Sequence, residues 1–206
     1  MSGDSGQVVV YWNEGPDDSA VNGWRFNPGG VIATGVPHAN LATLRFPDIN
    51  GDGRADYVII GEGGSLGLWL NTGQQGSYDL VFVAQGGIAS GAASDLSRID
   101  LADINGDGRA DYLIWDDNAG LSGFLNIRTR KEGTPFFADQ GGSKVIADGI
   151  GQAPSSIRLA DHDGDGLLDY CYIDNNGALF LWFNRGTGDA SVTGEYLSAT
   201  APTTLS

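Results

Sequence analysis

Basic residues are scarce in this sequence. Lys and Arg together number 11, against 26 Asp and Glu, so the formal net charge at pH 7 is −15. No stretch gathers Lys and Arg into a cluster that would reverse this sign locally. Because phosphate backbones and anionic lipid surfaces are bound through positive charge, nucleic acid and anionic membranes are not expected as partners.

The chain also lacks disulfides and long apolar runs. Its single cysteine, Cys171, rules out an internal disulfide, and its setting in the strand-like run 169–173 predicts an inert packed thiol. No apolar run approaches the roughly 20 residues of a membrane-spanning helix, so no membrane insertion is expected. The first residues, MSGDSGQ, are polar and contain no signal-peptide core.

Catalytic arrangements are equally scarce. The two histidines, His38 and His162, are isolated, and the four glutamates lie in unrelated contexts. Glycoside hydrolysis needs two carboxyl groups at a defined separation, and the common serine hydrolases carry G-x-S-x-G. Neither arrangement is visible here. The sequence therefore predicts that the chain is not an enzyme.

Glycine, in contrast, is abundant, with 33 residues, and internal repetition dominates the sequence. Three stretches align with one another: residues 44–71, 99–126 and 157–184. Their acidic segments begin at Asp48, Asp103 and Asp161, so the repeat period is 55 and then 58 residues.

Each repeat carries the signals of four short strands. In the first copy a short alternating run (43–46) enters the acidic segment, a β-branched run (57–60) leaves it, and an aromatic strand ending in Asn (68–71) follows a Gly-rich turn. A further strand-like segment precedes each copy, at residues 29–35, 86–91 and 144–149. Four antiparallel strands in such a period predict an all-β fold of β-propeller-type blades.

The predicted organisation is a single repeat domain, 1–206, with three full blades at 24–71, 80–126 and 136–184. A partial blade strand is predicted at 7–13 and a terminal strand at 194–199. Unpaired strand edges recruit other strands, so these end strands are expected either to pair with each other or to join a second copy. The shortage of strands in the partial blade favours the second arrangement, a homodimer.

Each acidic segment reads D-x-[DN]-x-D-G-x-x-D. Three such segments in register favour a metal site over simple Asp/Asn/Gly turns. Alternate residues can point inward, Gly in the sixth place permits the turn, and the carbonyl of the seventh residue adds an oxygen. Calcium prefers six to eight oxygen ligands, so three calcium sites are predicted. The predicted ligands are Asp48, Asn50, Asp52, Arg54 and Asp56; Asp103, Asn105, Asp107, Arg109 and Asp111; and Asp161, Asp163, Asp165, Leu167 and Asp169.

An EF-hand is not expected, because position twelve of each segment is a strand-like residue (Ile59, Ile114, Tyr172) where that loop has Glu. The motif D-x-[DN]-x-D-G-x-x-D-[YL] with its preceding apolar strand instead resembles the FG-GAP/VCBS repeats. These are the calcium-binding blades of integrin-α-type propellers, of fungal propeller lectins and of many secreted proteins. The resemblance covers roughly residues 7 to 186 and implies an extracellular, calcium-binding propeller.

The resemblance leaves function open, because its members differ in what they do. The leading expectation is a calcium-dependent carbohydrate-binding protein, a lectin or lectin-like module, whose partners are glycans or glycoproteins. Trp69, Phe124 and Trp182 share one repeat position and are expected in the core between blades. Trp24 and Trp115 do not recur and are the predicted ligand contacts, with their rings expected to be exposed. The alternatives are a protein-binding adhesion module and an accessory domain of a secreted hydrolase or lyase.

Overall fold

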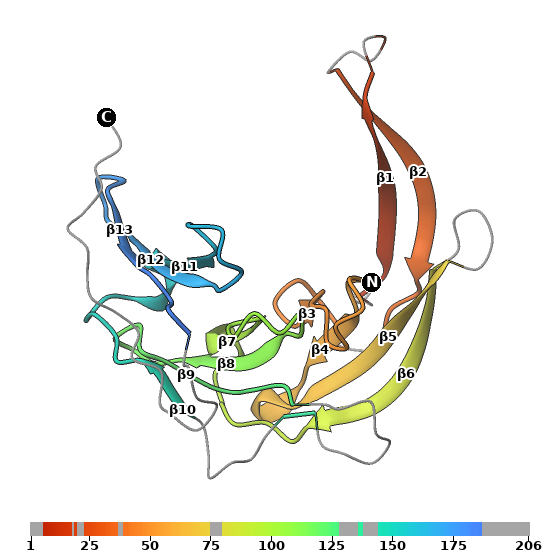
Figure 1. Ribbon diagram of the computed structural model, residues 1–206. Coiled ribbons are helices and arrows are strands. Elements are labelled where there is room, and N and C mark those ends of the chain that lie inside the picture. The colour runs from red at the N-terminus through yellow and green to blue at the C-terminus, as the bar shows by residue number, and fades with distance from the viewer. Residues whose placement is uncertain are drawn as a thin grey trace.

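The computed structural model describes residues 6–17, 19, 23–36, 39–74, 80–127, 136–137 and 144–186. The chain folds into antiparallel sheets that follow one another in chain order around an open arc (Figure 1). The described residues contain no α-helix and do not close the arc into a ring. The all-β prediction is therefore confirmed, while ring closure stays a prediction. The predicted strand 194–199 lies outside the described residues.

Two of the sheets are complete four-stranded meanders. The first repeat sheet has the order β3 (Leu44–Arg45), β4 (Tyr57–Ile60), β5 (Leu66–Gln74), β6 (Leu80–Ala89). The second repeat sheet has the order β7 (Ile99–Ala102), β8 (Asp111–Trp115), β9 (Leu121–Phe124), β10 (Lys144–Ala147). In each, consecutive strands pair with each other, and the acidic loop joins the first strand to the second.

The outer two sheets show fewer strands. The third repeat sheet has β11 (Ile157–Ala160), β12 (Asp169–Ile173) and β13 (Leu179–Trp182), joined in that order. The N-terminal sheet has two strands, β1 (Val8–Pro16) and β2 (Trp24–Ala33). These two sheets lie at opposite ends of the arc (Figure 1).

The sheets divide the chain differently from the predicted blades. The segments 29–35, 86–91 and 144–149 were expected to open blades 24–71, 80–126 and 136–184. Strands β2, β6 and β10 pair instead with the aromatic strand that precedes them in the chain. The aromatic strand has two edges, and the next strand in the sequence supplies the partner that its second edge needs. The complete sheets therefore span residues 44–89 and 99–147.

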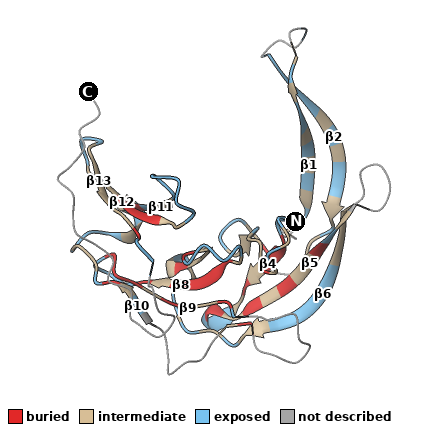
Figure 2. Ribbon diagram, in the orientation of Figure 1, coloured by how far each residue is buried: buried red, intermediate tan, exposed pale blue. Residues whose placement is uncertain are grey.

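The core lies between neighbouring sheets (Figure 2). One cluster of buried residues joins Val58 and Leu68 of the first repeat sheet to Ile99 of the second. A second cluster joins Leu113 of the second repeat sheet to Ile157 of the third. Strands β4 and β8 are buried over most of their length. Burial on both faces is expected of strands covered by a sheet on either side.

Tyrosines reinforce the stacking of the sheets. The hydroxyl of Tyr112 donates to the carbonyl of Gly64 at 2.9 Å, and that of Tyr170 donates to the carbonyl of Ala119 at 2.8 Å. In each case the acceptor lies just before the aromatic strand of the preceding sheet. Tyr57 repeats the contact with Gly6, which lies just before β1, at 3.0 Å. The same residue of each repeat thus links it to the preceding sheet.

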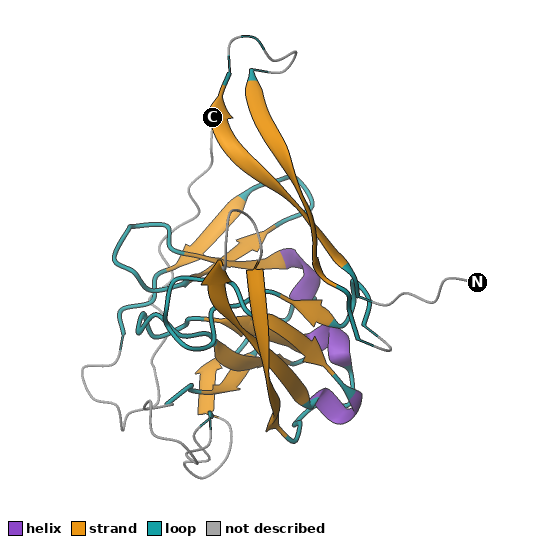
Figure 3. Ribbon diagram, turned by 90° about the vertical axis from the view of Figure 1, so that its right-hand side faces the viewer, coloured by secondary structure: helices purple, strands orange, loops and turns teal. Residues whose placement is uncertain are grey.

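Three single-turn 3-10 helices complete the described structure: η1 (Glu62–Gly64), η2 (Leu96–Arg98) and η3 (Pro154–Ser156). They lie along one side of the stacked sheets (Figure 3). Within the described residues, no helix has the length and apolar character needed to cross a membrane.

Candidate metal loops and inter-sheet pockets

The first acidic loop, residues 48–56, wraps around the carboxylate that opens it. Asp48 accepts backbone N–H groups from Gly51 at 2.8 Å and from Gly53 at 2.7 Å, one on each carboxylate oxygen. Both glycines have positive φ, +74° and +81°. This left-handed conformation is strained for a residue with a Cβ. Glycine at these two places therefore lets the chain turn tightly around Asp48.

The other two loops repeat this geometry. Asp103 accepts the N–H of Gly108 at 2.7 Å, and Asp161 accepts those of Gly164 at 2.7 Å and Gly166 at 3.0 Å. The glycines of these loops also have positive φ. The three segments that were aligned by sequence therefore adopt one backbone turn, each between the first two strands of a repeat sheet.

The aspartate that closes each loop is fully buried and holds the loop against the sheet. Asp111 is 0% exposed. It accepts the N–H of Ile104 inside the loop at 3.0 Å and the N–H of Asn126, just after β9, at 2.7 Å. Asp56 and Asp169 make the equivalent pairs of bonds. A single carboxylate thus fastens each acidic loop to the aromatic strand of its own sheet.

Burial changes the acidity of two of these carboxyl groups, Asp111 and Asp56. Desolvation raises the pKa of Asp111 to about 7, against the opposing N–H donors of Asn126 and Ile104. The neighbouring charges of Asp107 and Asp103 raise this pKa further. Desolvation is also the main cause of the raised pKa of Asp56. A cation in the loop would favour the ionised form of these groups.

The third loop brings three carboxylates together. Oxygens of Asp161, Asp163 and Asp169 all lie within 4.8 Å of one another. The first two loops have Asn50 and Asn105 where the third has Asp163. Every side chain in these sets offers oxygen, which is the donor that calcium prefers and which soft metals do not. The residues present therefore fit a calcium ion.

In each loop an arginine side chain forms an ion pair with an aspartate. The guanidinium of Arg54 contacts Asp52 at 2.5 Å, and that of Arg109 contacts Asp107 at 2.6 Å. The third loop has Leu167 at this position, and Arg185 contacts Asp163 at 2.6 Å and Asp165, the counterpart of Asp52 and Asp107, at 3.6 Å. The guanidinium groups of Arg54, Arg109 and Arg185 thus form ion pairs with carboxylates of the loops. The predicted role of Arg54, Arg109 and Leu167 as carbonyl ligands stays a prediction.

The two predicted tryptophan contacts differ in exposure. Trp24 is 53% exposed, at the start of β2. Trp115 is only 8% exposed and belongs to the core between the second and third repeat sheets, so the expectation of an exposed ring is wrong. Its ring packs against Tyr170 at 6.1 Å between centroids. It still lines a cavity of about 630 Å³ together with Arg98 and Arg158.

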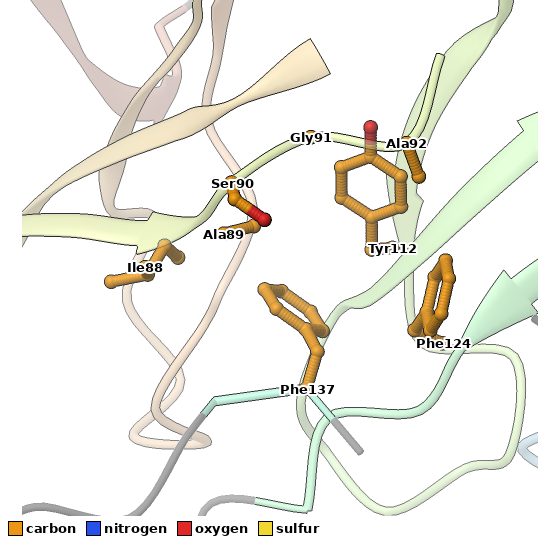
Figure 4. Close-up of a pocket in the computed structure, with 8 residues that line it drawn as sticks. All are labelled: Ile88, Ala89, Ser90, Gly91, Ala92, Tyr112, Phe124 and Phe137. Atoms are coloured by element: carbon orange, nitrogen blue, oxygen red, sulfur yellow. The ribbon is translucent and has the colours of Figure 1, made fainter. Parts of the chain in front are cut away.

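Two equivalent pockets lie between sheets, and neither contains Trp24 or Trp115. The larger, of about 430 Å³, is lined by Tyr112, Phe124, Phe137 and residues 88–92. Figure 4 shows the aromatic rings facing the 88–92 segment, and the side chain of Ser90 points toward the rings. The smaller pocket, of about 300 Å³, repeats it one sheet earlier. Its lining residues are Tyr57, Trp69, Phe82 and residues 32–36.

Sequence reasoning missed these pockets. It placed Trp69 and Phe124 in the core between blades, yet both are only half-buried and line the pockets. A signal was present in the recurring phrase Ile-Ala-[Thr/Ser]-Gly at 32–35 and 88–91, which forms one wall of each pocket. The phrase alone does not predict a pocket, because the space between two sheets depends on how the sheets stack.

Comparison with known proteins covers part of the chain. Residues 48–114 match the family model of the FG-GAP-like repeat. The match runs from the first aspartate of the first acidic loop into β8, and so includes the first two loops. No curated protein matches the chain. The match supports the FG-GAP repeat family for this part of the structure.

Proposed function

We propose that this chain is an extracellular, calcium-binding repeat module that recognises carbohydrate in pockets between its sheets. The observation that carries the proposal is the repetition of one pocket at the same place on two successive sheets. Both pockets place an aromatic ring at the same three repeat positions and have the same Ile-Ala-[Thr/Ser]-Gly wall.

Calcium is supported by the loops themselves. The first two gather carboxylate and amide oxygens around one turn, and the third holds three carboxylates within 4.8 Å of one another. Uncompensated carboxylates at such distances repel one another, and a divalent cation removes that cost. Calcium sites of extracellular modules are typically weak, with Kd of about 10⁻⁴ to 10⁻³ M, which suits the calcium concentration outside cells.

Carbohydrate is supported by the composition of the pockets. Each has three aromatic rings, small residues that leave room for a ligand, and one exposed hydroxyl, Ser90 or Thr34. Ligand sites commonly combine an apolar lining with a few placed polar groups. The C–H face of a sugar ring can pack on an aromatic ring while its hydroxyls bond to Ser90 and nearby backbone groups. Repeated weak sites would gain strength from a multivalent glycan.

The test is a glycan array probed with the calcium-loaded protein. Ala92→Phe fills the larger pocket from its exposed rim, and Ala42→Phe adds the same ring at an exposed position outside both pockets. We expect the parent protein and Ala42→Phe to bind glycans on the array. Binding of Ala92→Phe to the same glycans should be several-fold weaker. Equal retention by the two variants, or none by the calcium-loaded parent, would overturn the proposal.

A further inference from the structure

The N-terminal sheet repeats the outer half of a complete sheet. Up to Asn13 and Asn71, strands β1 and β2 pair in the same register as β5 and β6, and the first two of the three register shifts in each pair fall between corresponding residues. In this register Asn13 opposite Phe26 corresponds to Asn71 opposite Phe82. Strand β1 is therefore the equivalent of the aromatic strand β5, and its other edge corresponds to the edge of β5 that pairs with β4.

The asparagine at the end of the aromatic strand has a fixed partner in every repeat sheet. The N–H groups of Asn71, Asn126 and Asn184 each donate to a buried aspartate that closes an acidic loop, at 2.7 to 2.8 Å. Asn13 adopts the same local turn, since its side chain accepts the N–H of Gly15 at 2.9 Å as Asn71 accepts that of Gly73 at 3.0 Å. Among the described residues, no carboxylate accepts the N–H of Asn13.

Two exposed aromatic residues of the N-terminal sheet correspond to residues that are covered in the first repeat sheet. In the first repeat sheet the ring of Tyr57, on β4, packs edge-on against Trp69 and Phe82 at 5.6 and 6.1 Å. The corresponding residues of the N-terminal sheet are Tyr11 and Phe26, which are 61% and 57% exposed. These side chains occupy the positions that a tyrosine from an inner strand covers elsewhere in the chain.

A residue in the neighbouring sheet points to the same gap. The side-chain amides of Asn126 and Asn184 each donate to two carbonyls, one in their own loop and one in the loop of the preceding sheet. The amide of Asn71 donates to Ala55 in its own loop at 3.1 Å. Asn126 and Asn184 also donate to a carbonyl in the acidic loop of the preceding sheet. Within the described part of the chain, Asn71 has no such second acceptor.

We propose that the edge of β1 that faces away from β2, which pairs with no strand of the described residues, is a docking site for a β-hairpin of the repeat type. This hairpin has two short strands joined by a D-x-[DN]-x-D-G-x-x-D loop and followed by Tyr. Its closing aspartate accepts the N–H of Asn13, its tyrosine covers Tyr11 and Phe26, and its loop carbonyl accepts the amide of Asn71. A second copy of this chain is a poorer occupant, because its three described hairpins of this type are already paired within their own sheets.

The sequence ahead of β1 offers a way to test this docking. The sequence Gly3-Asp4-Ser5-Gly6 ahead of β1 resembles Gly61-Glu62-Gly63-Gly64, which joins β4 to β5. A copy of residues 43–60 can therefore be placed directly before Gly3, in place of the first two residues. In this extended chain the copied Val58 should lie opposite Val10, as Val58 lies opposite Leu68 in the first repeat sheet.

The experiment compares amide exchange and cross-linking in this extended chain. We expect exchange of the Asn13 amide to slow at least about tenfold relative to the parent chain, because a paired amide exchanges only on opening. The matched control carries Asp56→Ala and Tyr57→Ala in the copied hairpin and should leave the amide fast. Directly opposite strand residues lie within disulfide reach, so Val58→Cys in the copy should cross-link with Val10→Cys and not with Val9→Cys.

Three outcomes would overturn the proposal. One is equal exchange at Asn13 in the extended chain and its control. Another is equal cross-linking of both cysteine pairs, which would show that β1 fixes no register. The third is a slow Asn13 amide in the parent chain together with a mass of twice 21.5 kDa by light scattering, which would identify a second copy as the occupant. None of these readouts depends on glycan binding.

Discussion

The side-chain amide of Asn126 donates to the carbonyl of Ile49, 2.8 Å away, and so ties the second repeat sheet to the acidic loop of the first. The two residues are 77 positions apart in the chain. The same amide also donates to Ala110 in its own loop, so one buried side chain holds two successive loops in place.

This double contact predicts a large effect of Asn126→Leu. The substitution leaves two buried carbonyls without their donor, and each such loss costs about 1 to 3 kcal/mol. We expect the free energy of unfolding to fall by about 2 to 5 kcal/mol, measured by urea denaturation. Asn118→Leu, at an exposed turn position, is the control and should change it little. A fall at position 126 no larger than at 118 would show that the link between the loops is not stabilising.

Removal of calcium should destabilise the protein and empty the three loops unequally. A ligand that binds only the folded state stabilises it by mass action, so EDTA should lower Tm by many degrees. The third loop combines Asp161, Asp163 and Asp169, whereas the others have Asn in one place, and more ligand charge gives tighter calcium binding. Stepwise chelation, followed by elemental analysis of loop variants, should find the third site filled longest. Equal loss from all three would contradict this order.

Calcium binding in the second loop should weaken below neutral pH. The pKa of Asp111 is raised to about 7 in the metal-free fold, so a proton competes with the cation there. Below pH 7 the affinity of this site should fall by about tenfold per pH unit, since its ligand must be deprotonated.

The stability of the metal-free protein should respond in the opposite direction. A carboxyl group whose folded pKa exceeds its unfolded value binds more protons in the folded state. Its burial therefore destabilises the fold fully above pH 7, and this cost is relieved as pH falls towards 4. The Tm difference between calcium and EDTA should shrink from pH 8 to pH 5.5. Asp111→Asn should reduce this pH dependence, and an unchanged Tm difference across the range would contradict the assignment.

The sequence predicted the acidic loops and most strands because both are local. Asp48 and the glycines that turn around it lie within six residues, so their spacing carries the geometry. The grouping of strands into sheets was predicted less well. The segment 86–91 could pair with the strand before it or the strand after it, and the choice depends on which of them has an unpaired edge, as β5 does before β6 is added. Local pattern also misplaced Trp115. Its counterparts in the other repeats are Ile60 and Ile173. Tryptophan does not recur at this position because another apolar residue replaces it, not because the position is exposed.

The glycines before β5 offer a matched test of how the sheets stack. Gly63 and Gly64 both have positive φ, +65° and +84°, so alanine at either should cost about 1 to 2 kcal/mol in backbone strain. A Cβ on Gly63 would meet nothing within 4 Å, whereas one on Gly64 would lie 2.5 Å from the Tyr112 hydroxyl and 2.8 Å from Ile99 Cδ1.

Gly64→Ala should therefore lower the free energy of unfolding more than Gly63→Ala does, because the added methyl group pushes two packed sheets apart. Because overpacking typically costs about 1 to 3 kcal/mol, we expect a clear difference in unfolding free energy between the two variants. The Tyr112 hydroxyl, which donates to Gly64, should also lose its hydrogen bond in Gly64→Ala alone, and near-ultraviolet circular dichroism would report the change around its ring. Equal destabilisation by the two alanines would mean that backbone strain, and not contact between the first and second repeat sheets, sets the requirement for glycine at position 64.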